Sequence, residues 1–419
     1  MRKLARIWSV WTAQLGAGGT SMKLRVVALC AWAALGLSAQ TLTTLDSFGG
    51  ASGADPAAGL LQASDGNFYG TTYAGAKNKS GTVFKITANG TLTTLYTFCS
   101  QASCADGERP QGRLVEAGNG DLYGTTYAGG AHNQGTVFKI TLSGTVTTLY
   151  SFCPHGGGCA DGRAPEAGLI QATDGDLYGT TYLGGANGGG TVFKITPQGR
   201  LTTVYNFCSL ARCADGSEPV AGLIQVTSGE FYGTTYLGGA QGNGSIFKIT
   251  PSGTLKTLYS FCSLPNCADG DLPDAGLVEA TNGDLYGTTS NGGANDNGFN
   301  HPGTVFKITP SGTFATLYSF CALANCADGQ GPYALLVQAS NGNLYGTTQQ
   351  GGNAFSGTIF EITPSGTLTT LYSFCSMSNC ADGTLPDGGM IQGSDGELYG
   401  TTYGGGAKGY GTVFSFTLP

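Results

Sequence analysis

Charged side chains are scarce in this sequence. Lys, Arg, Asp and Glu make up only 11% of its 419 residues, against roughly 25% in an ordinary globular domain. The 19 basic residues are outnumbered by 26 acidic ones, the formal charge is -7, and the repeats described below contain no basic cluster. A protein that binds nucleic acid needs cationic side chains to face the phosphates. We therefore expect no nucleic-acid partner.

Long apolar runs are absent beyond the N-terminal segment. After residue 39 no stretch reaches the 18 or so residues that a membrane-spanning helix needs, so we expect no membrane span and no C-terminal anchor. Residues 1–39 have the pattern of an export leader, with a basic segment from Met22, an apolar run over 26–37 and small residues before a cleavage site. Met22 is the expected start, the alternative being a long basic region over 1–21. We expect an exported protein: secreted, periplasmic or at the cell surface.

Histidine is the scarcest polar residue, and the motifs of common enzyme classes are missing. His132, His155 and His301 are the only three, and all fall in long loops without an identifiable carboxylate or nucleophile partner for general-base catalysis. The sequence has no Gly-Lys-Ser/Thr phosphate loop, zinc-protease helix or Gly-x-Ser-x-Gly elbow. We therefore assign no catalytic residue and no cofactor.

The 13 cysteines predict local disulfides. Cys30 lies in the leader, and in the first repeat copy, residues 48–55, glycines replace both members of a pair at once, which indicates that the partners are bonded. A zinc site would need further ligands, and only His155 lies between two paired cysteines, so we expect no metal. The disulfides fit an oxidising compartment. Each predicted pair precedes an Ala-Asp-Gly segment: Cys99/Cys104, Cys153/Cys159, Cys208/Cys213, Cys262/Cys267, Cys321/Cys326 and Cys375/Cys380.

One repeat fills the chain after the leader. Its Tyr-Gly-Thr-Thr segment occurs seven times, with starts 54 or 55 residues apart except for one interval of 59. Each copy holds four short runs rich in β-branched and aromatic residues, separated by turn residues, which is the pattern of strands. The seven segments begin at Phe68, Leu122, Leu177, Phe231, Leu285, Leu344 and Leu398.

Four antiparallel strands per repeat favour a β-propeller, although a parallel solenoid is also repetitive. The two chain ends favour the ring, because a lone strand at 41–48 and three strands at 389–417 add up to one blade and leave no open edge. We predict an all-β, seven-bladed propeller over residues 40–419. Its predicted blades are 55–98, 111–152, 165–207, 219–261, 273–320, 332–374, and 386–418 together with 40–48.

The repeat resembles a known family. The strings Asp-Gly-Asp-Leu-Tyr-Gly-Thr-Thr-Tyr at 174–182, Gly-Thr-Val-Phe-Lys-Ile-Thr-Pro at 190–197 and Leu-Thr-Thr-Val-Tyr-Asn-Phe at 201–207 are similar to the bacterial "choice-of-anchor" tandem-repeat family called GloVer. The resemblance implies a bacterial exported repeat protein and assigns no biochemical role. Members often end in an anchoring domain, which this sequence lacks. The third-strand and turn pattern is distantly similar to virginiamycin B lyase, a seven-bladed enzyme.

Two of the four connections in each repeat are long, and in a four-stranded blade both fall on the same face. Function is expected there, because loops on a rigid scaffold carry it. Each Asp of an Ala-Asp-Gly segment should accept backbone N–H bonds and so cap its own loop, calcium binding being the alternative. These residues are Asp106, Asp161, Asp215, Asp269, Asp328 and Asp382, with Asp55 expected to complete a ring of seven.

Tyrosines mark the end of the second strand in five copies, where they could stack on sugars or hold a peptide or else pack between blades. The earlier tyrosine of each Tyr-Gly-Thr-Thr segment is expected in the core. The long loop 291–302, with Asp296, Phe299 and His301, predicts an asymmetric pocket, the alternative being a neutral insertion. The strand-end tyrosines are Tyr73, Tyr127, Tyr182, Tyr236 and Tyr403, with Ser290 and Gln349 in the other two copies.

The function that these features favour is binding. We predict a monomeric binding or interaction module for a glycan or a peptide. A lyase- or hydrolase-like propeller enzyme is the first alternative, and a structural protein of the cell envelope is the second, because the fold alone implies no chemistry.

Overall fold

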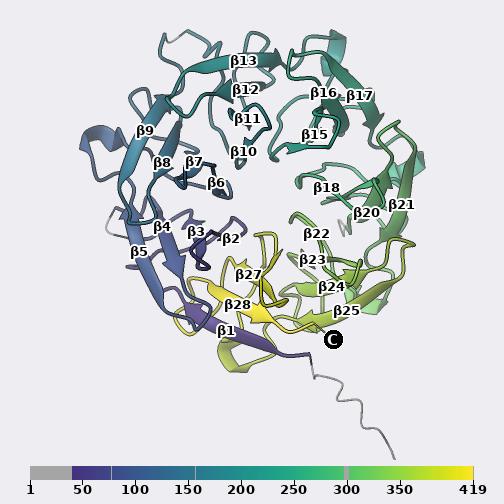
Figure 1. Cartoon of the computed structure of the whole chain (residues 1–419). Coiled ribbons are helices and arrows are strands. Elements are labelled where there is room, and N and C mark those ends of the chain that lie inside the picture. The colour runs from purple at the N-terminus through teal and green to yellow at the C-terminus, as the bar shows by residue number, and fades with distance from the viewer. Residues whose placement is uncertain (1–39, 77, 156, 297–301, 419) are drawn as a thin grey trace, which may run out of the picture. The chain divides into compact units, whose positions relative to one another are not determined.

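The computed structural model describes residues 40–76, 78–155, 157–296 and 302–418. Seven antiparallel sheets of four strands each stand in a ring (Figure 1). The predicted seven-bladed β-propeller is therefore confirmed. The leader, residues 1–39, lies outside the described residues, so the export signal stays a prediction.

Each blade is built from a two-residue inner strand followed by three longer strands. The inner strands lie nearest the centre of the ring in Figure 1. The first complete blade consists of β2 (Leu61–Gln62), β3 (Phe68–Thr72), β4 (Thr82–Ile86) and β5 (Leu92–Thr97). The next five are β6 (Val115–Glu116), β7 (Leu122–Thr126), β8 (Thr136–Ile140) and β9 (Val146–Ser151); β10 (Ile170–Gln171), β11 (Leu177–Thr181), β12 (Thr191–Ile195) and β13 (Leu201–Asn206); β14 (Ile224–Gln225), β15 (Phe231–Thr235), β16 (Ser245–Ile249) and β17 (Leu255–Ser260); β18 (Val278–Glu279), β19 (Leu285–Thr289), β20 (Thr304–Ile308) and β21 (Phe314–Ser319); and β22 (Val337–Gln338), β23 (Leu344–Thr348), β24 (Thr358–Ile362) and β25 (Leu368–Ser373).

The seventh blade joins the two ends of the chain. Its sheet contains β26 (Ile391–Gln392), β27 (Leu398–Thr402) and β28 (Thr412–Phe416), and its outer strand is β1 (Leu42–Ser47). β1 pairs antiparallel with β28, so that Leu42 lies opposite Phe416. This pairing confirms the predicted closure and covers an edge that would otherwise invite foreign strands.

The core lies between neighbouring blades. Tyr69 and Phe98 of one blade, for example, pack against Leu122 and Phe138 of the next, and all four are completely buried. The glycine after each core tyrosine is required by this packing, because a Cβ at Gly70 would lie 2.5 Å from the Phe84 ring. The predicted core tyrosines are confirmed, since at most 2% of any of them is exposed: Tyr69, Tyr123, Tyr178, Tyr232, Tyr286, Tyr345 and Tyr399.

The two long connections of each repeat lie against each other. Ala54, in the loop that leads to an inner strand, pairs antiparallel with Ala74, in the loop after a second strand, and the same pairing recurs in all seven copies. The inference that both loops share one face is confirmed. We call it the loop face, and we call the segment that leads from an outer strand to the next inner strand the entry loop.

The outer half of six entry loops is closed by a disulfide, as predicted. Five of these loops form a three-residue 3-10 helix: η1 (Ala102–Cys104), η2 (Ala211–Cys213), η3 (Pro265–Cys267), η4 (Ala324–Cys326) and η5 (Ser378–Cys380). The bonded pairs are Cys99–Cys104, Cys153–Cys159, Cys208–Cys213, Cys262–Cys267, Cys321–Cys326 and Cys375–Cys380.

The aspartates of the Ala-Asp-Gly segments cap these loops. The Asp106 carboxylate is completely buried and accepts bonds from the Ser100 and Gln101 N–H groups at 2.9 and 3.1 Å. Equivalent bonds to backbone N–H groups are made by the other five: Asp161, Asp215, Asp269, Asp328 and Asp382. The loop-cap interpretation is therefore confirmed.

The expectation that Asp55 completes this ring is wrong. Gly53 lies against Thr72 and Thr82 as Gly107 lies against Thr126 and Thr136, so Ser52 is the residue equivalent to Asp106. The Ser52 hydroxyl accepts the Gly49 N–H at 3.1 Å. The first entry loop is shorter than the others. Asp55 therefore lies three residues beyond the position that corresponds to Asp106.

Candidate functional site

A central cavity opens on the loop face. It has a volume of about 590 Å³, within the range of small-molecule sites. Eight of the described residues line its mouth. One is Gln349, and the other seven come one from each blade and follow the last proline of the entry loop. We call these seven residues the mouth ring: Ala57, Gln111, Glu166, Val220, Asp274, Tyr333 and Asp387.

The backbone under the mouth ring is nearly the same in every blade. The N–H at the end of a second strand bonds to the carbonyl two residues before the mouth position, as from Tyr236 to Glu218 at 3.0 Å. In six copies a threonine hydroxyl of the preceding blade donates a hydrogen bond to the carbonyl of the residue that follows the mouth position, as from Thr234 Oγ1 to Ala275 at 2.9 Å. The scaffold is thus constant, whereas six residue types occupy the seven mouth positions.

Three carboxyl groups give the mouth an acidic character. Burial, together with the nearby charges of Asp274 and Glu218, raises the pKa of Glu166 to about 7. Burial also raises the pKa of Asp274 to about 7, with Asp387 and Asp271 adding to the shift. Burial likewise raises the pKa of Asp387. At neutral pH the mouth therefore carries fewer negative charges than it has carboxyl groups.

Two of these carboxyl groups have different surroundings. The Gln349 amide donates a 2.7 Å hydrogen bond to Asp387 Oδ1. By contrast, Asp274 Oδ2 is buried and has no hydrogen-bond partner among the described residues. Burial raises the pKa of Asp274 by more than a hydrogen bond from the Ser290 side chain lowers it. Ser290 and Gln349, the two residues that replace a strand-end tyrosine, thus both adjoin acidic members of the mouth ring.

The strand-end tyrosines are half-buried on the loop face but do not line the cavity. Burial and a hydrogen bond to Glu218 raise the pKa of Tyr182 to about 12. Tyr73 lies under the Arg109 guanidinium at 5.7 Å, and Tyr403 lies near enough to Asp387 for its charge to raise the tyrosine pKa. A ligand-binding role for Tyr73, Tyr127, Tyr182, Tyr236 and Tyr403 stays a prediction, and Tyr333, which is 37% exposed, is the tyrosine that lines the mouth.

One layer deeper, a second ring of equivalent residues lines the cavity, and we call it the waist. Five of its seven positions are glycine because neighbouring backbones approach closely there: a Cβ at Gly168 would lie 2.5 Å from the Arg113 carbonyl oxygen. Arg113 is the one Lys or Arg side chain among the described residues that line the cavity, and it is exposed to the solvent inside. The waist consists of Gly59, Arg113, Gly168, Gly222, Gly276, Leu335 and Gly389, and the apolar floor includes Leu61, Val115, Ile170 and Ile224.

The pocket predicted at the long loop 291–302 is not tested by the structure. Phe299 and His301 lie outside the described residues, and the Asp296 N–H bonds to the Gly293 carbonyl at 3.1 Å within the loop. Asn295 anchors the loop by bonds to the Ser319 and Phe320 carbonyls. The other two histidines, His132 and His155, are exposed and do not line the cavity.

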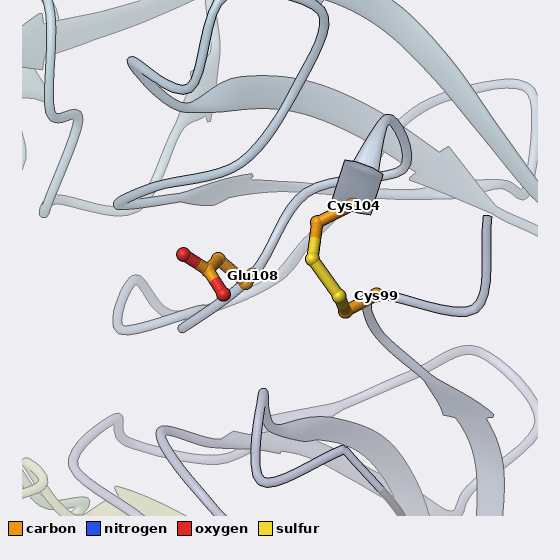
Figure 2. A group of neighbouring side chains, drawn as sticks. All are labelled: Cys99, Cys104 and Glu108. Carbon is orange, nitrogen blue, oxygen red and sulfur yellow. A yellow bond between two sulfur atoms is a disulfide. The ribbon is translucent and has the colours of Figure 1, made fainter. Parts of the chain in front are cut away.

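One cluster has side chains of the types that bind metals. In the described part of the chain it is the one group of three or more His, Cys, Asp or Glu residues whose ligand atoms converge, and it consists of Cys99, Cys104 and Glu108 (Figure 2). Its two sulfur atoms are bonded to each other and are therefore not available as thiolate ligands. The cluster offers one carboxylate and is no metal site.

Comparison with known proteins identifies the repeat. Residues 32–160, 154–301 and 264–419 match the model of the Gloeobacter/Verrucomicrobia repeat. The chain belongs to this repeat family. No curated protein has a sequence that matches this member of the family.

One solved structure shares the fold of this repeat-family protein. The extracellular domain of BT4673 from B. thetaiotaomicron, named as a hybrid two-component system, is 12% identical with a TM-score of 0.57, over 89% of this chain and 39% of that one. This chain thus spans well under half of that structure. The periplasmic gluconolactonase PpgL from Pseudomonas aeruginosa is 17% identical with a TM-score of 0.48, over 75% of this chain and 84% of its own. Within the described residues no helix has the length and hydrophobicity to cross a bilayer.

Sequence reasoning missed the mouth ring. A signal was present, since the residue after the entry-loop proline varies between copies while the proline itself occurs in all seven. The Ala-Asp-Gly and tyrosine positions recur more regularly and therefore give a stronger sequence signal. What the sequence could not supply is that the entry-loop prolines bring these seven residues to one cavity.

Proposed function

We propose that this repeat-family propeller is an extracytoplasmic binding protein that holds a glycan at its mouth ring. The observation that carries the proposal is the contrast between a constant scaffold and a variable mouth. Seven equivalent backbone positions face one cavity, and they present acidic, amide, aromatic and aliphatic side chains. A symmetric ring offers equivalent half-sites, whereas a small ligand needs the asymmetry that these substitutions create.

The side chains of the mouth suit a sugar. Carboxylates and amides accept and donate hydrogen bonds to hydroxyl groups, and Glu166, Asp274, Asp387 and Gln349 supply them. Tyr333 adds an exposed aromatic ring, whose flat apolar face and polar tip suit stacking on a pyranose. A few convergent polar groups in a cavity are the usual composition of a ligand site.

An extracytoplasmic location is supported by the disulfides. Six bridges in one chain are typical of oxidising compartments and rare in the cytosol.

A glycan array probed with the purified protein tests the proposal. We expect binding to a restricted set of oligosaccharides, and we expect Tyr333→Ala and Asp387→Asn to weaken it at least ten-fold. The control is Glu279→Gln, which removes an exposed carboxylate at the far end of an inner strand. A protein that binds no glycan, or whose binding survives both mouth substitutions, contradicts the proposal. Binding to peptides instead would assign the mouth to the other predicted ligand class.

Catalysis is the second candidate, because Glu166 and Asp274 each have a pKa of about 7. A carboxyl group of this kind in a cavity can act as a general acid near neutral pH. Incubation with each glycan that the array identifies, followed by analysis of the products, tests this. Turnover that Asp274→Asn or Glu166→Gln abolishes would favour an enzyme.

A further inference from the structure

The charged side chains of the mouth ring are all acidic. Glu166, Asp274 and Asp387 line it, and no Lys or Arg belongs to the mouth ring. Arg113, the cation that lines the cavity, belongs to the waist one layer deeper. Among the described residues no ion pair joins a base to any of the three mouth carboxyl groups. Their charges therefore repel one another without internal compensation.

Asp274 is the strongest sign that a donor is missing. Its Oδ2 atom has no hydrogen-bond partner among the described residues, the Ser290 hydroxyl is the one side-chain donor beside the carboxyl group, and the residue itself lines the cavity. A buried carboxylate that lacks donors is costly. In five copies a tyrosine occupies the position of Ser290, which adjoins Asp274. Because serine is smaller than tyrosine, a hydrogen-bond donor of a ligand is the group best placed to reach this carboxylate.

A preformed metal site does not account for the acidic mouth. Among the described residues, the oxygen atoms of Glu166, Asp274 and Asp387 are not a group that converges closely enough to hold one ion. The three groups nevertheless interact, since the charge of Asp274 acts on Glu166 and that of Asp387 acts on Asp274. An ammonium group suits a ring of carboxyl groups, because its three N–H donors can each face a different oxygen acceptor.

We infer that the mouth ring recognises a positively charged primary amino group, and that the glycan of the proposed function is an amino sugar with its amine free. This inference rests on the proposed function and deepens it. The ammonium group would lie in the mouth between Asp274 and the other two acidic members of the ring. The same chemistry could come from lysine side chains of a peptide, which the experiment below distinguishes.

Binding of an ammonium group should change the protonation of the mouth carboxyl groups. The groups that face Asp274 are Asp271, Asp387, Tyr236, Tyr333, Glu166 and Ser290, and none of them is a base. An ammonium ion favours the ionised form of each carboxyl group. Below about pH 6 the amine itself stays protonated, so binding should release protons from these carboxyl groups there, and affinity should rise as the pH increases from about 5 to 6. A neutral sugar that accepts hydrogen bonds from protonated carboxyl groups would show the opposite trend.

Isothermal titration calorimetry with the full chain tests this. The probes are a glucosamine oligosaccharide, its fully N-acetylated counterpart and hexalysine, each measured in two buffers of different ionisation enthalpy. We expect the glucosamine oligomer to bind at least ten-fold more tightly than the acetylated one, with net proton release at pH 5.5, where the amine is already protonated. Asp274→Asn should reduce both the affinity and the proton release, whereas Glu279→Gln should change neither.

The outcomes separate the two proposals. Equal affinity for both oligosaccharides, or no proton release, overturns the amine inference and leaves the glycan proposal standing. Binding to hexalysine alone supports recognition of the amine and overturns the amino sugar and the glycan proposal. If no probe binds, and the array finds no glycan either, both proposals fail.

Discussion

Two aspartates of the same entry loop, five residues apart, have opposite surroundings. Asp269 is completely buried and accepts bonds from Tyr259 Oη, Ser263 N and Leu264 N at 2.7, 2.9 and 3.0 Å. Asp274 lines the cavity, and its Oδ2 atom has no partner among the described residues. The first belongs to the outer half of the loop, which recurs in six blades, and the second to the mouth ring, where the blades differ. Asp269 is thus satisfied by its own loop, whereas Asp274 keeps one unsatisfied oxygen atom at the mouth.

If the contacts of the scaffold stabilise the fold, removing the strand that closes the ring should lower the stability most. Deletion of residues 41–47 removes β1 and exposes the edge of β28 along the register from Leu42 to Ser47. Unpaired N–H and C=O groups on such an edge favour aggregation. We expect loss of the cooperative thermal transition, or aggregates in size-exclusion chromatography. A monomer with an unchanged melting temperature would show that the ring does not need its closing strand.

The two aspartates themselves give the most direct comparison. Asp269→Ala leaves at least two buried N–H donors without an acceptor, so we expect it to lower the free energy of unfolding by about 3 kcal/mol. Asp274→Ala removes a desolvated carboxyl group and should cost less than about 1 kcal/mol, or should even stabilise the protein. Urea unfolding at pH 7.5 measures both. Similar losses for the two variants would refute the division into scaffold and mouth.

The disulfides should contribute less than the capping aspartates. Replacing Cys262 and Cys267 together by alanine opens a loop of six residues, which the chain-entropy model values at about 2 kcal/mol. The first entry loop, which closes without cysteines through the Gly50–Gly53 bridge, indicates that the fold survives. Urea unfolding gives the cost. Peptide mapping without reduction should recover the six local pairs, and a bridge between blades would contradict them.

The mouth should also make stability depend on pH. Folding raises the pKa of Glu166 and Asp274 to about 7 from about 4 in an unfolded chain. Between these values the folded protein binds more protons, so its stability falls as the pH rises from 4 to 7 and then levels off. After allowance for solvent screening, we expect a loss of about 2 kcal/mol between pH 5 and 8. Thermal unfolding should show that Asp274→Asn loses part of this dependence and that Glu279→Gln keeps all of it.

The smallest effect is expected at the long loop of the fifth blade. Replacing residues 296–301 with a short glycine-serine link keeps Asn295 and its two bonds to β21 and the following residue. Because the mouth ring is untouched, we expect unchanged melting and unchanged ligand affinity. A loss of binding would instead favour the site first predicted from Asp296, Phe299 and His301.

Most of the scaffold could be predicted from the sequence, for a physical reason. Strand patterns, turns and cysteine pairs are local features, and seven copies within one chain repeat each of them, so the blades, the buried tyrosines such as Tyr178 and the disulfides followed directly. After the leader the chain begins with one strand and ends with three, which together make one blade, and this predicted that the ring closes. The error at Asp55 arose where the first copy is shorter and the local match was lost.

The site was decided by tertiary structure alone. Glu166, Asp274 and Asp387 lie on three blades and are separated by more than a hundred residues in the sequence between each pair, so no local pattern connects them. Closing the ring brings their equivalent positions to one cavity, and burial there raises their pKa values. A sequence specifies which side chain follows each proline, but whether that side chain faces solvent, a neighbour or a shared cavity depends on how the blades pack.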